Sequence, residues 1–108
     1  MDAEMIILCD GIVIPGSQKE IDGGVAVAQG QILRIGQRME LSDYLGIDTE
    51  VLEYHNSTLF TFNRRSESED ANIAVVAGNR KRGHGALKKL VVLRFLMYHG
   101  DVVYQKDL

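Results

Sequence analysis

The chain has very few of the residues that crosslink or stiffen a protein. Its 108 residues include one cysteine, one proline and no tryptophan, and aromatic residues make up 6% of the total. A single cysteine, Cys9, excludes a disulfide within the chain. Because Cys9 lies in the apolar run 5–9, we expect a buried, reduced thiol that packs as a small hydrophobe in a cytoplasmic protein.

Long apolar runs are also missing. No stretch reaches the roughly 18 apolar residues that span a membrane, and Arg94 interrupts the most apolar segment, 90–98. The acidic start, Met-Asp-Ala-Glu, is unlike a signal peptide. The length itself excludes a (β/α)₈ barrel, which needs about 200 residues or more. We therefore expect a small cytoplasmic protein with no membrane partner.

Charge is divided unevenly along the chain, whose formal net charge is −3. Residues 1–55 carry three Lys or Arg against ten Asp or Glu, a net charge of −7. Residues 56–108 carry nine against five, a net charge of +4. This asymmetry fits a surface for an acidic partner in the second half, or two halves of different origin.

Turn dipeptides divide the first sixty residues into short apolar segments. Residues 22–36 read D-G-G-V-A-V-A-Q-G-Q-I-L-R-I-G, which predicts a β-hairpin that turns at Gln29-Gly30. Asp10-Gly11 predicts another turn, between strands at 5–9 and 12–14. We expect further strands at 51–54, 58–62 and 73–77, and a short helix at 39–45.

The second half reads differently. Residues 63–72 are polar and aperiodic, which predicts a loop or linker. Residues 86–99 predict a helix, because Ala86, Leu90, Leu93 and Met97 share one helical face. His99 and Gly100 suit the C-terminus of that helix. The apolar residues Val91, Val92 and Phe95 leave a strand as the alternative.

These patterns predict a mainly β fold, a small β-sandwich or sheet layer, with a C-terminal α-helix at 86–99, and so an α+β protein overall. Residues 1–63 would form the β region. Residues 64–108 would form a polar linker and a basic C-terminal segment, unless the whole chain is one small domain.

Residues 5–63 resemble the beginning of amidohydrolase-superfamily enzymes, which are metal-dependent hydrolases and deaminases of C–N bonds. M-I-I-L-C-D-G-I-V-I resembles the first hairpin of that family, and residues 22–36 resemble the second. V-L-E-Y stands where the family has a V-I-D strand, and N-S-T-L-F-T-F-N resembles the approach to the first barrel strand. The resemblance implies an accessory β-sandwich, part of a composite domain, that rests on a catalytic barrel.

The resemblance ends just before the family's metal-binding motif. The family continues into a His-x-His pair, whereas this chain continues as Arg64-Arg65-Ser66-Glu67 and contains no His-x-His. Activation of water by a metal takes about three protein ligands at one site. The resemblance therefore implies a metal-dependent parent activity, with a divalent metal such as zinc expected only in a full-length relative. This chain would be a truncated or frameshifted relative that is non-catalytic and binds no cofactor by itself.

Other candidate sites rest on isolated residues. His99 with Asp101 could bind a metal or carry out acid–base chemistry, although a helix-terminal His beside a turn Asp is the commoner explanation. A basic cluster suits an acidic partner or nucleic acid, or else a solvated surface; it consists of Arg80, Lys81, Arg82, Lys88 and Lys89. The glycine-rich residues 78–85 lack the Lys-Ser/Thr ending of a phosphate-binding loop.

Two functions therefore remain open from the sequence. The first is an amidohydrolase-like, non-catalytic fragment that contacts a barrel-bearing chain or self-associates through exposed sheet edges. The second is an independent β module whose basic second half binds an acidic partner or nucleic acid. Salt-dependent binding of nucleic acid would favour the second function.

Overall fold

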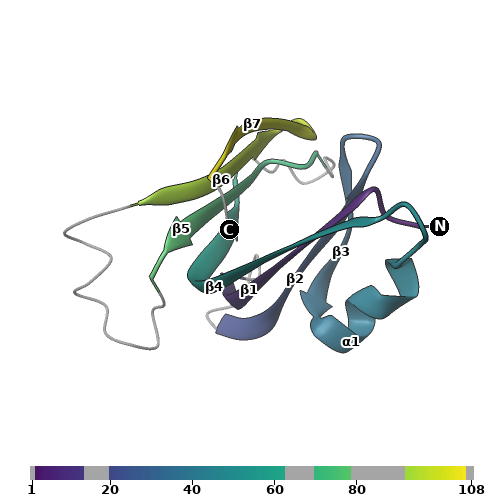
Figure 1. Cartoon of the computed structure of the whole chain (residues 1–108), viewed down its shortest axis with the longest axis horizontal. Coiled ribbons are helices and arrows are strands. Elements are labelled where there is room, and N and C mark those ends of the chain that lie inside the picture. Colours follow the sequence, from purple (N-terminus) through teal and green to yellow (C-terminus); the bar gives the residue numbers. More distant parts are fainter. Residues whose placement is uncertain (1, 14–19, 63–69, 79–91, 107–108) are drawn as a thin grey trace.

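The computed structural model describes residues 2–13, 20–62, 70–78 and 92–106, which form a seven-stranded mixed sheet and one short helical segment (Figure 1). The strands are β1 (Met5–Val13), β2 (Glu20–Ala28), β3 (Gln31–Gln37), β4 (Glu50–Thr61), β5 (Ile73–Ala77), β6 (Leu93–Tyr98) and β7 (Asp101–Gln105). The helical segment consists of α1 (Arg38–Leu41) and the 3₁₀ turn η1 (Ser42–Tyr44). Across the sheet the order is β3-β2-β1-β4-β5-β6-β7.

The hairpin predicted at residues 22–36 is confirmed. β2 and β3 pair antiparallel around Gln29 and Gly30, whose φ angles of 53° and 76° are both positive. A two-residue type I′ turn requires two positive φ angles, which glycine adopts without strain. β1 then lies between β2, to which it is antiparallel, and β4, to which it is parallel.

Two predicted strand breaks lie inside continuous strands. Asp10-Gly11 falls within β1, where the register with both neighbours shifts and the chain does not reverse. The strands predicted at 51–54 and 58–62 are one strand, β4, which is irregular at Asn56, where φ is 51°. The Asn56 backbone N–H donates to Asp10 Oδ2 at 2.5 Å, so the two irregularities are joined. An Asp-Gly pair suits a bulge as well as a turn, and the neighbouring strands decide between them.

The predicted C-terminal helix at 86–99 is wrong. Residues 93–98 form β6, and β6 and β7 form a hairpin around the turn at His99-Gly100. Residues 86–91 lie outside the described residues. The described helical segment lies at 38–44 and overlaps the short helix expected at 39–45, so the protein is mainly β, and residues 92–106 contain no helix.

The reason for this error lies in the composition of β6. Nearly every residue from 90 to 97 is apolar. Apolar residues therefore occur both at helical spacing and at every second position, so the pattern fits a helix and a strand equally well. In the structure Phe95 and Met97 are buried on one face of β6, which pairs antiparallel with β5. Gly100, expected as a helix cap, has a positive φ of 84° in the hairpin turn. Pairing with β5 decides between the two patterns.

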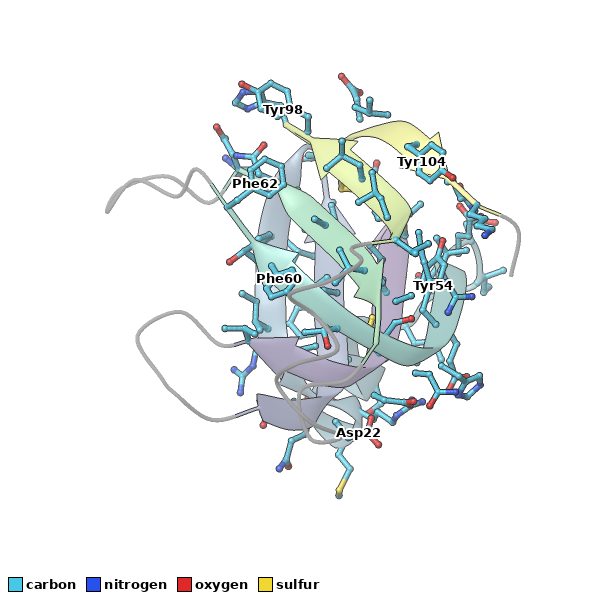
Figure 2. The ribbon with its side chains drawn as sticks, turned by 90° about the vertical axis from the view of Figure 1, so that its left-hand side faces the viewer. Asp22, Tyr54, Phe60, Phe62, Tyr98 and Tyr104 are labelled. Carbon is cyan, nitrogen blue, oxygen red and sulfur yellow. The ribbon has the colours of Figure 1, made fainter. Side chains whose placement is uncertain are left out.

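The sheet coils so that β2 and β3 share one core with β5 and β6 (Figures 1 and 2). The inner face is buried along most of the strands, and its larger members are Ile7, Val25, Leu52, Tyr54, Leu59, Ile73, Val75, Phe95 and Met97. The rings of Tyr54 and Phe95 lie 6.1 Å apart between centroids. The β2–β3 turn also contacts the segment before β5, because Ala71 N donates to Gly30 O at 2.9 Å. The strands of both sequence halves thus surround the same apolar interior.

A smaller core lies on the outer face of the first three strands, under α1. Leu41 is buried there against Ala3, Ile6 and Ala26. The helical segment therefore covers part of the outer face of β1 and β2. The neighbouring outer surface of β1 and β4 lies beside the helical segment and is not covered by it. Among the described residues, no helix has the length and apolar character required to cross a membrane.

Candidate functional site

An apolar groove lies beside the helical segment, on the outer side of β1 and β4. Its cavity volume is about 170 Å³. The apolar lining consists of Ile6, Leu8, Leu41, Leu45 and Val51, and Arg38 and Ser42 complete it. We call these seven residues the helix groove. Leu45 and Val51 are 55% and 45% exposed, so the groove presents apolar surface to solvent on both sides.

Backbone hydrogen bonds hold the helical segment and the following turn against the start of β1. Ala3 N donates to Tyr44 O at 2.7 Å, and Leu45 N donates to Ser42 O at 3.2 Å. Gly46 N donates to Thr49 Oγ1 at 2.8 Å, and that hydroxyl donates to Ala3 O at 2.6 Å. The last of these bonds joins residues 46 positions apart, and together the bonds fix the helical segment, which forms one wall of the groove, against the start of β1.

Arg38 ties the first turn of α1 to two strands. Its Nε lies 3.0 Å from Asp22 Oδ1 and its Nη2 lies 2.8 Å from Glu53 Oε2. The hydrogen bond to Asp22, followed by that to Glu53, raises the pKa of Arg38 above its ordinary value. The positive charge at the end of the helix groove is therefore already neutralised by two carboxylates.

A second ion pair stabilises the helical segment from β3. Arg34 Nη2 lies 2.5 Å from Glu40 Oε2, and both side chains are exposed. The hydrogen bond from Arg34 lowers the pKa of Glu40 below its ordinary value. This pair lies on the surface and is open to screening by salt.

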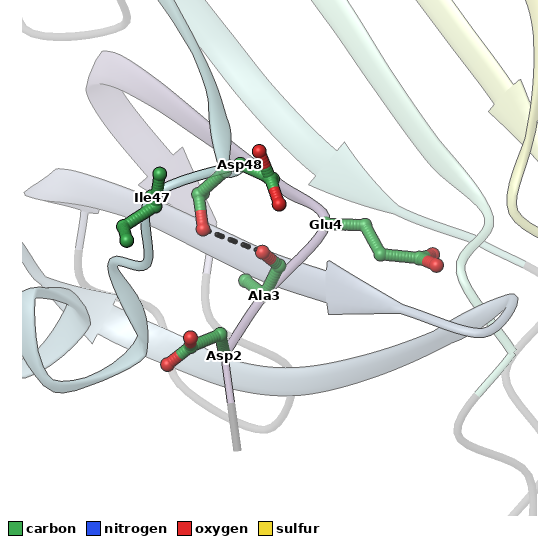
Figure 3. Close-up of a pocket in the computed structure, with 6 residues that line it drawn as sticks. Asp2, Ala3, Glu4, Ile47 and Asp48 are labelled. Carbon is green, nitrogen blue, oxygen red and sulfur yellow. Dashed lines mark hydrogen bonds between the residues drawn. The ribbon is translucent and has the colours of Figure 1, made fainter.

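A second, polar hollow lies next to the helix groove, beyond the turn at 45–49 (Figure 3). Its cavity volume is about 410 Å³, and it is lined by Asp2, Ala3, Glu4, Ile47, Asp48 and Thr49. We call these six residues the acidic hollow. Figure 3 shows Asp2 and Asp48 on either side of the hydrogen bond from Thr49 to Ala3. Ile47, which lines the acidic hollow, is fully exposed.

His99 contacts a different partner from the one that the sequence suggested. His99 lies in the β6–β7 turn, and its Nδ1 is 3.0 Å from Asp70 Oδ2, whereas Asp101 begins the exposed strand β7. The His99 backbone N–H donates to Asn72 Oδ1 at 2.9 Å, and φ at His99 is 51°. His99 therefore helps to join the β6–β7 turn to the segment before β5.

His55 lies on β4 beside two carboxylates. Its Nδ1 is 3.8 Å from Asp10 Oδ1 and its Nε2 is 3.9 Å from Glu53 Oε2, beyond hydrogen-bond distance. Across residues 2–13, 20–62, 70–78 and 92–106, no three His, Cys, Asp or Glu side chains form a group that could hold a metal ion. His84 lies outside the described residues.

Cys9 is fully buried in the main core, as the apolar run around it predicts. Burial, with a smaller contribution from the nearby Asp10 carboxylate, raises the pKa of the thiol from 9.0 to about 12. Cys9 is therefore a neutral core side chain at physiological pH and not a nucleophile.

The basic cluster that the sequence offered for an acidic partner lies outside the described residues. This holds for Arg80, Lys81, Arg82, Lys88 and Lys89. Arg94, which is basic and described, serves the fold, because its Nη1 donates to His55 O and to Ser57 Oγ, each at 2.9 Å. Its guanidinium also lies over the Tyr54 ring, 5.2 Å from the centroid. Binding of nucleic acid by the basic half stays a prediction.

β7 forms one edge of the sheet and is exposed along its whole length. Its pairing with β6 shifts register between Leu96 and Met97, a bulge of the kind that blunts edge-to-edge association. Figure 2 shows Tyr98 and Tyr104 on β6 and β7, and the Tyr98 ring stacks on Phe62 at 6.5 Å between centroids. Self-association through the sheet edges stays a prediction.

Comparison of the chain with protein-family models, with curated proteins and with solved structures finds no match. The functional conclusion therefore rests on the geometry and on the sequence pattern. Sequence reasoning missed the helix groove altogether. The available signal was the pair of exposed apolar residues Leu45 and Ile47 in an acidic stretch, which is unusual for a solvated turn.

Proposed function

We propose that this chain is a docking module and not a catalyst: an accessory β-layer like that of amidohydrolases, which binds a separate protein through the helix groove. The observation that carries this proposal is the groove itself. It is apolar, hydrogen bonds hold the helical segment beside it against the start of β1, and its lining residues Leu45 and Val51 are about half exposed. Exposed apolar grooves of this kind mark surfaces that bind proteins.

The location of the groove supports the amidohydrolase part of the proposal. The groove is formed by β1, α1 and the start of β4, and all three belong to residues 5–63, where the sequence resembles that family. The V-L-E-Y segment, which stands at the place of the V-I-D strand, lies in β4 and pairs with β1. An accessory layer that normally rests on a barrel needs an apolar contact surface, and the helix groove provides one.

The first test of this proposal is to read the encoding DNA from codon 55 to several hundred bases beyond codon 108, in all three forward frames. A His-x-His motif followed by alternating strand and helix patterns in another frame is the expected result. Absence of such a frame would contradict the relationship to amidohydrolases.

The second test measures docking directly. If the barrel is encoded, it should be expressed as a separate chain and titrated with this protein by calorimetry. We expect 1:1 binding that weakens about tenfold in the double variant Leu45→Ser, Val51→Ser, since each substitution removes apolar contact area. Val103→Ser, a substitution of a somewhat more exposed residue in β7, serves as the control and should leave the affinity unchanged. Equal losses in both variants would contradict docking at the groove.

A further inference from the structure

We propose that the helix groove binds a basic amphipathic protein segment, whose apolar side chains enter the groove and whose Lys or Arg side chains lie over the neighbouring carboxylates. This inference rests on the proposed function, because it takes the groove to be a docking surface. It adds the chemistry of the partner.

The first argument is the sign of the charge around the groove. Residues 43–53, which supply lining residues to both hollows, contain no Lys, Arg or His. Asp48 lines the acidic hollow, and Glu53, on the same face of β4 as the groove residue Val51, forms an ion pair with Arg38. Asp2 lines the acidic hollow from the other side, whereas the Glu4 carboxylate extends away from it (Figure 3) and accepts a hydrogen bond from the Gln29 backbone N–H at 2.9 Å. A partner that carries positive charge gains Coulomb energy here, whereas an anionic partner is repelled.

The second argument is that the cation at the groove does not offset these carboxylates. Arg38 lies between Asp22 and Glu53 and is hydrogen bonded to both, so the three groups together are net negative. Asp48 and Asp2 line the acidic hollow with exposed side chains. Their carboxylates therefore face solvent where the side chains of a bound segment would lie.

The third argument is the arrangement of apolar and acidic surface. Leu45 and Val51 line the helix groove, and Ile47, in the turn between them, is fully exposed beside the acidic hollow. Apolar and acidic surfaces thus lie next to each other along one short stretch. A segment with Leu or Ile on one side and Lys or Arg on the other is complementary to both at once. Nucleic acid and anionic lipid headgroups match neither.

The test uses the full chain labelled with ¹⁵N and three synthetic peptides of about 14 residues, a length that can form an amphipathic helix. One peptide contains Leu and Lys, the second has Glu at each Lys position, and the third has Ser there. We expect the Leu/Lys peptide to shift the amide resonances of Leu8, Leu45 and Val51. We also expect it to bind about tenfold more tightly than the Leu/Ser peptide, through its several charge pairs, and the Leu/Glu peptide to bind most weakly.

Charge variants complete the test. Asp48→Lys should weaken binding of the Leu/Lys peptide about fivefold, the upper range for one exposed charge pair, and should leave the Leu/Ser peptide unaffected. Asp101→Lys, the same charge reversal in the edge strand β7, is the matched control and should change neither. Because both residues are exposed, neither variant is expected to disturb folding.

The outcomes separate this inference from the proposed function. Equal binding of the Leu/Lys and Leu/Ser peptides at the groove would overturn the basic partner and retain a docking surface. Failure of the Leu/Lys peptide to bind, or shifts confined to β6 and β7, would overturn the inference. Binding of the chain to phosphatidylserine vesicles in preference to the Leu/Lys peptide would also overturn it. The family relationship is tested independently by the encoding DNA.

Discussion

Gly30 and Gly100 lie in direct backbone contact, although they belong to different hairpin turns. A Cβ built on Gly100 would stand 2.3 Å from Gly30 Cα, and a Cβ built on Gly30 would stand 3.2 Å from His99 O. Gly100 N also donates to Ala71 O at 3.0 Å. The two turns therefore meet at a place where a side chain on Gly100 has no room, and this contact helps to keep the coiled sheet closed.

Gly100→Ala should destabilise the protein strongly. The substitution introduces a Cβ against backbone atoms and also places alanine at a φ of 84°, so we expect a loss of about 2–4 kcal/mol in the free energy of unfolding. Urea denaturation followed by circular dichroism measures this loss. Gly36→Ala is the control, because its new Cβ would meet only the carboxylate end of the Glu40 side chain, which can rotate away, and we expect a change within about 1 kcal/mol. Similar losses in both variants would argue against close contact between the two turns.

Phe95→Ala should be among the most costly core substitutions. Phe95 is fully buried on β6 and contacts Tyr54, so truncation should cost about 3–5 kcal/mol in the free energy of unfolding. Val103→Ala, in the neighbouring strand, should change the stability by less than about 0.5 kcal/mol because Val103 is 62% exposed. Thermal and chemical denaturation of both variants give the two values. Comparable losses would mean that β6 and β7 do not pack as described.

Arg38 should contribute more to stability than Arg34. Arg38→Met keeps the apolar stem and removes the ion pairs with Asp22 and Glu53, which should cost about 1 kcal/mol after allowance for solvent screening. Arg34→Met removes one exposed pair, with Glu40, and should cost less. The difference between the variants should shrink in high salt. A double-mutant cycle of Arg38→Met with Glu53→Gln measures the coupling, and a value near zero would contradict a structural role for the pair.

Cys9 should be protected from thiol reagents in the folded protein. Because its pKa is raised from 9.0 to about 12, the thiol should react with iodoacetamide at neutral pH only after the chain unfolds. The labelling rate, measured by mass spectrometry, should therefore rise sharply in denaturant. Fast labelling of the native protein would show that Cys9 is accessible.

The same shift predicts a pH dependence of stability. The folded state holds the Cys9 proton more tightly than the unfolded state does, so this contribution is complete below pH 9 and is lost as the pH rises toward 12. The stability of the protein should fall more steeply over this range than that of Cys9→Ala, in which the thiol is absent. Parallel pH profiles for the two proteins would contradict the raised pKa.

Local sequence signals predicted those parts of the fold in which neighbours in the chain decide the conformation. Gln29-Gly30 predicted its hairpin because a two-residue turn with positive φ angles needs few other contacts. The strand at 73–77 and the burial of Cys9 followed from short apolar runs. These features depend on backbone preferences and on local hydrophobicity, both of which can be read from a single sequence.

Only the tertiary structure decided the other features of the fold and the existence of the helix groove. Asp10-Gly11 became a bulge because β2 and β4 continue the pairing of β1 on both sides of it. Residues 93–98 became a strand because β5 supplies hydrogen-bond partners to an apolar segment that suits either helix or strand. The helix groove exists because Leu8 meets Leu45 and Val51, which lie far from it in the chain, on one outer face of the sheet. Each of these results depends on contacts between distant segments, and no local pattern encodes which distant segment a strand will meet.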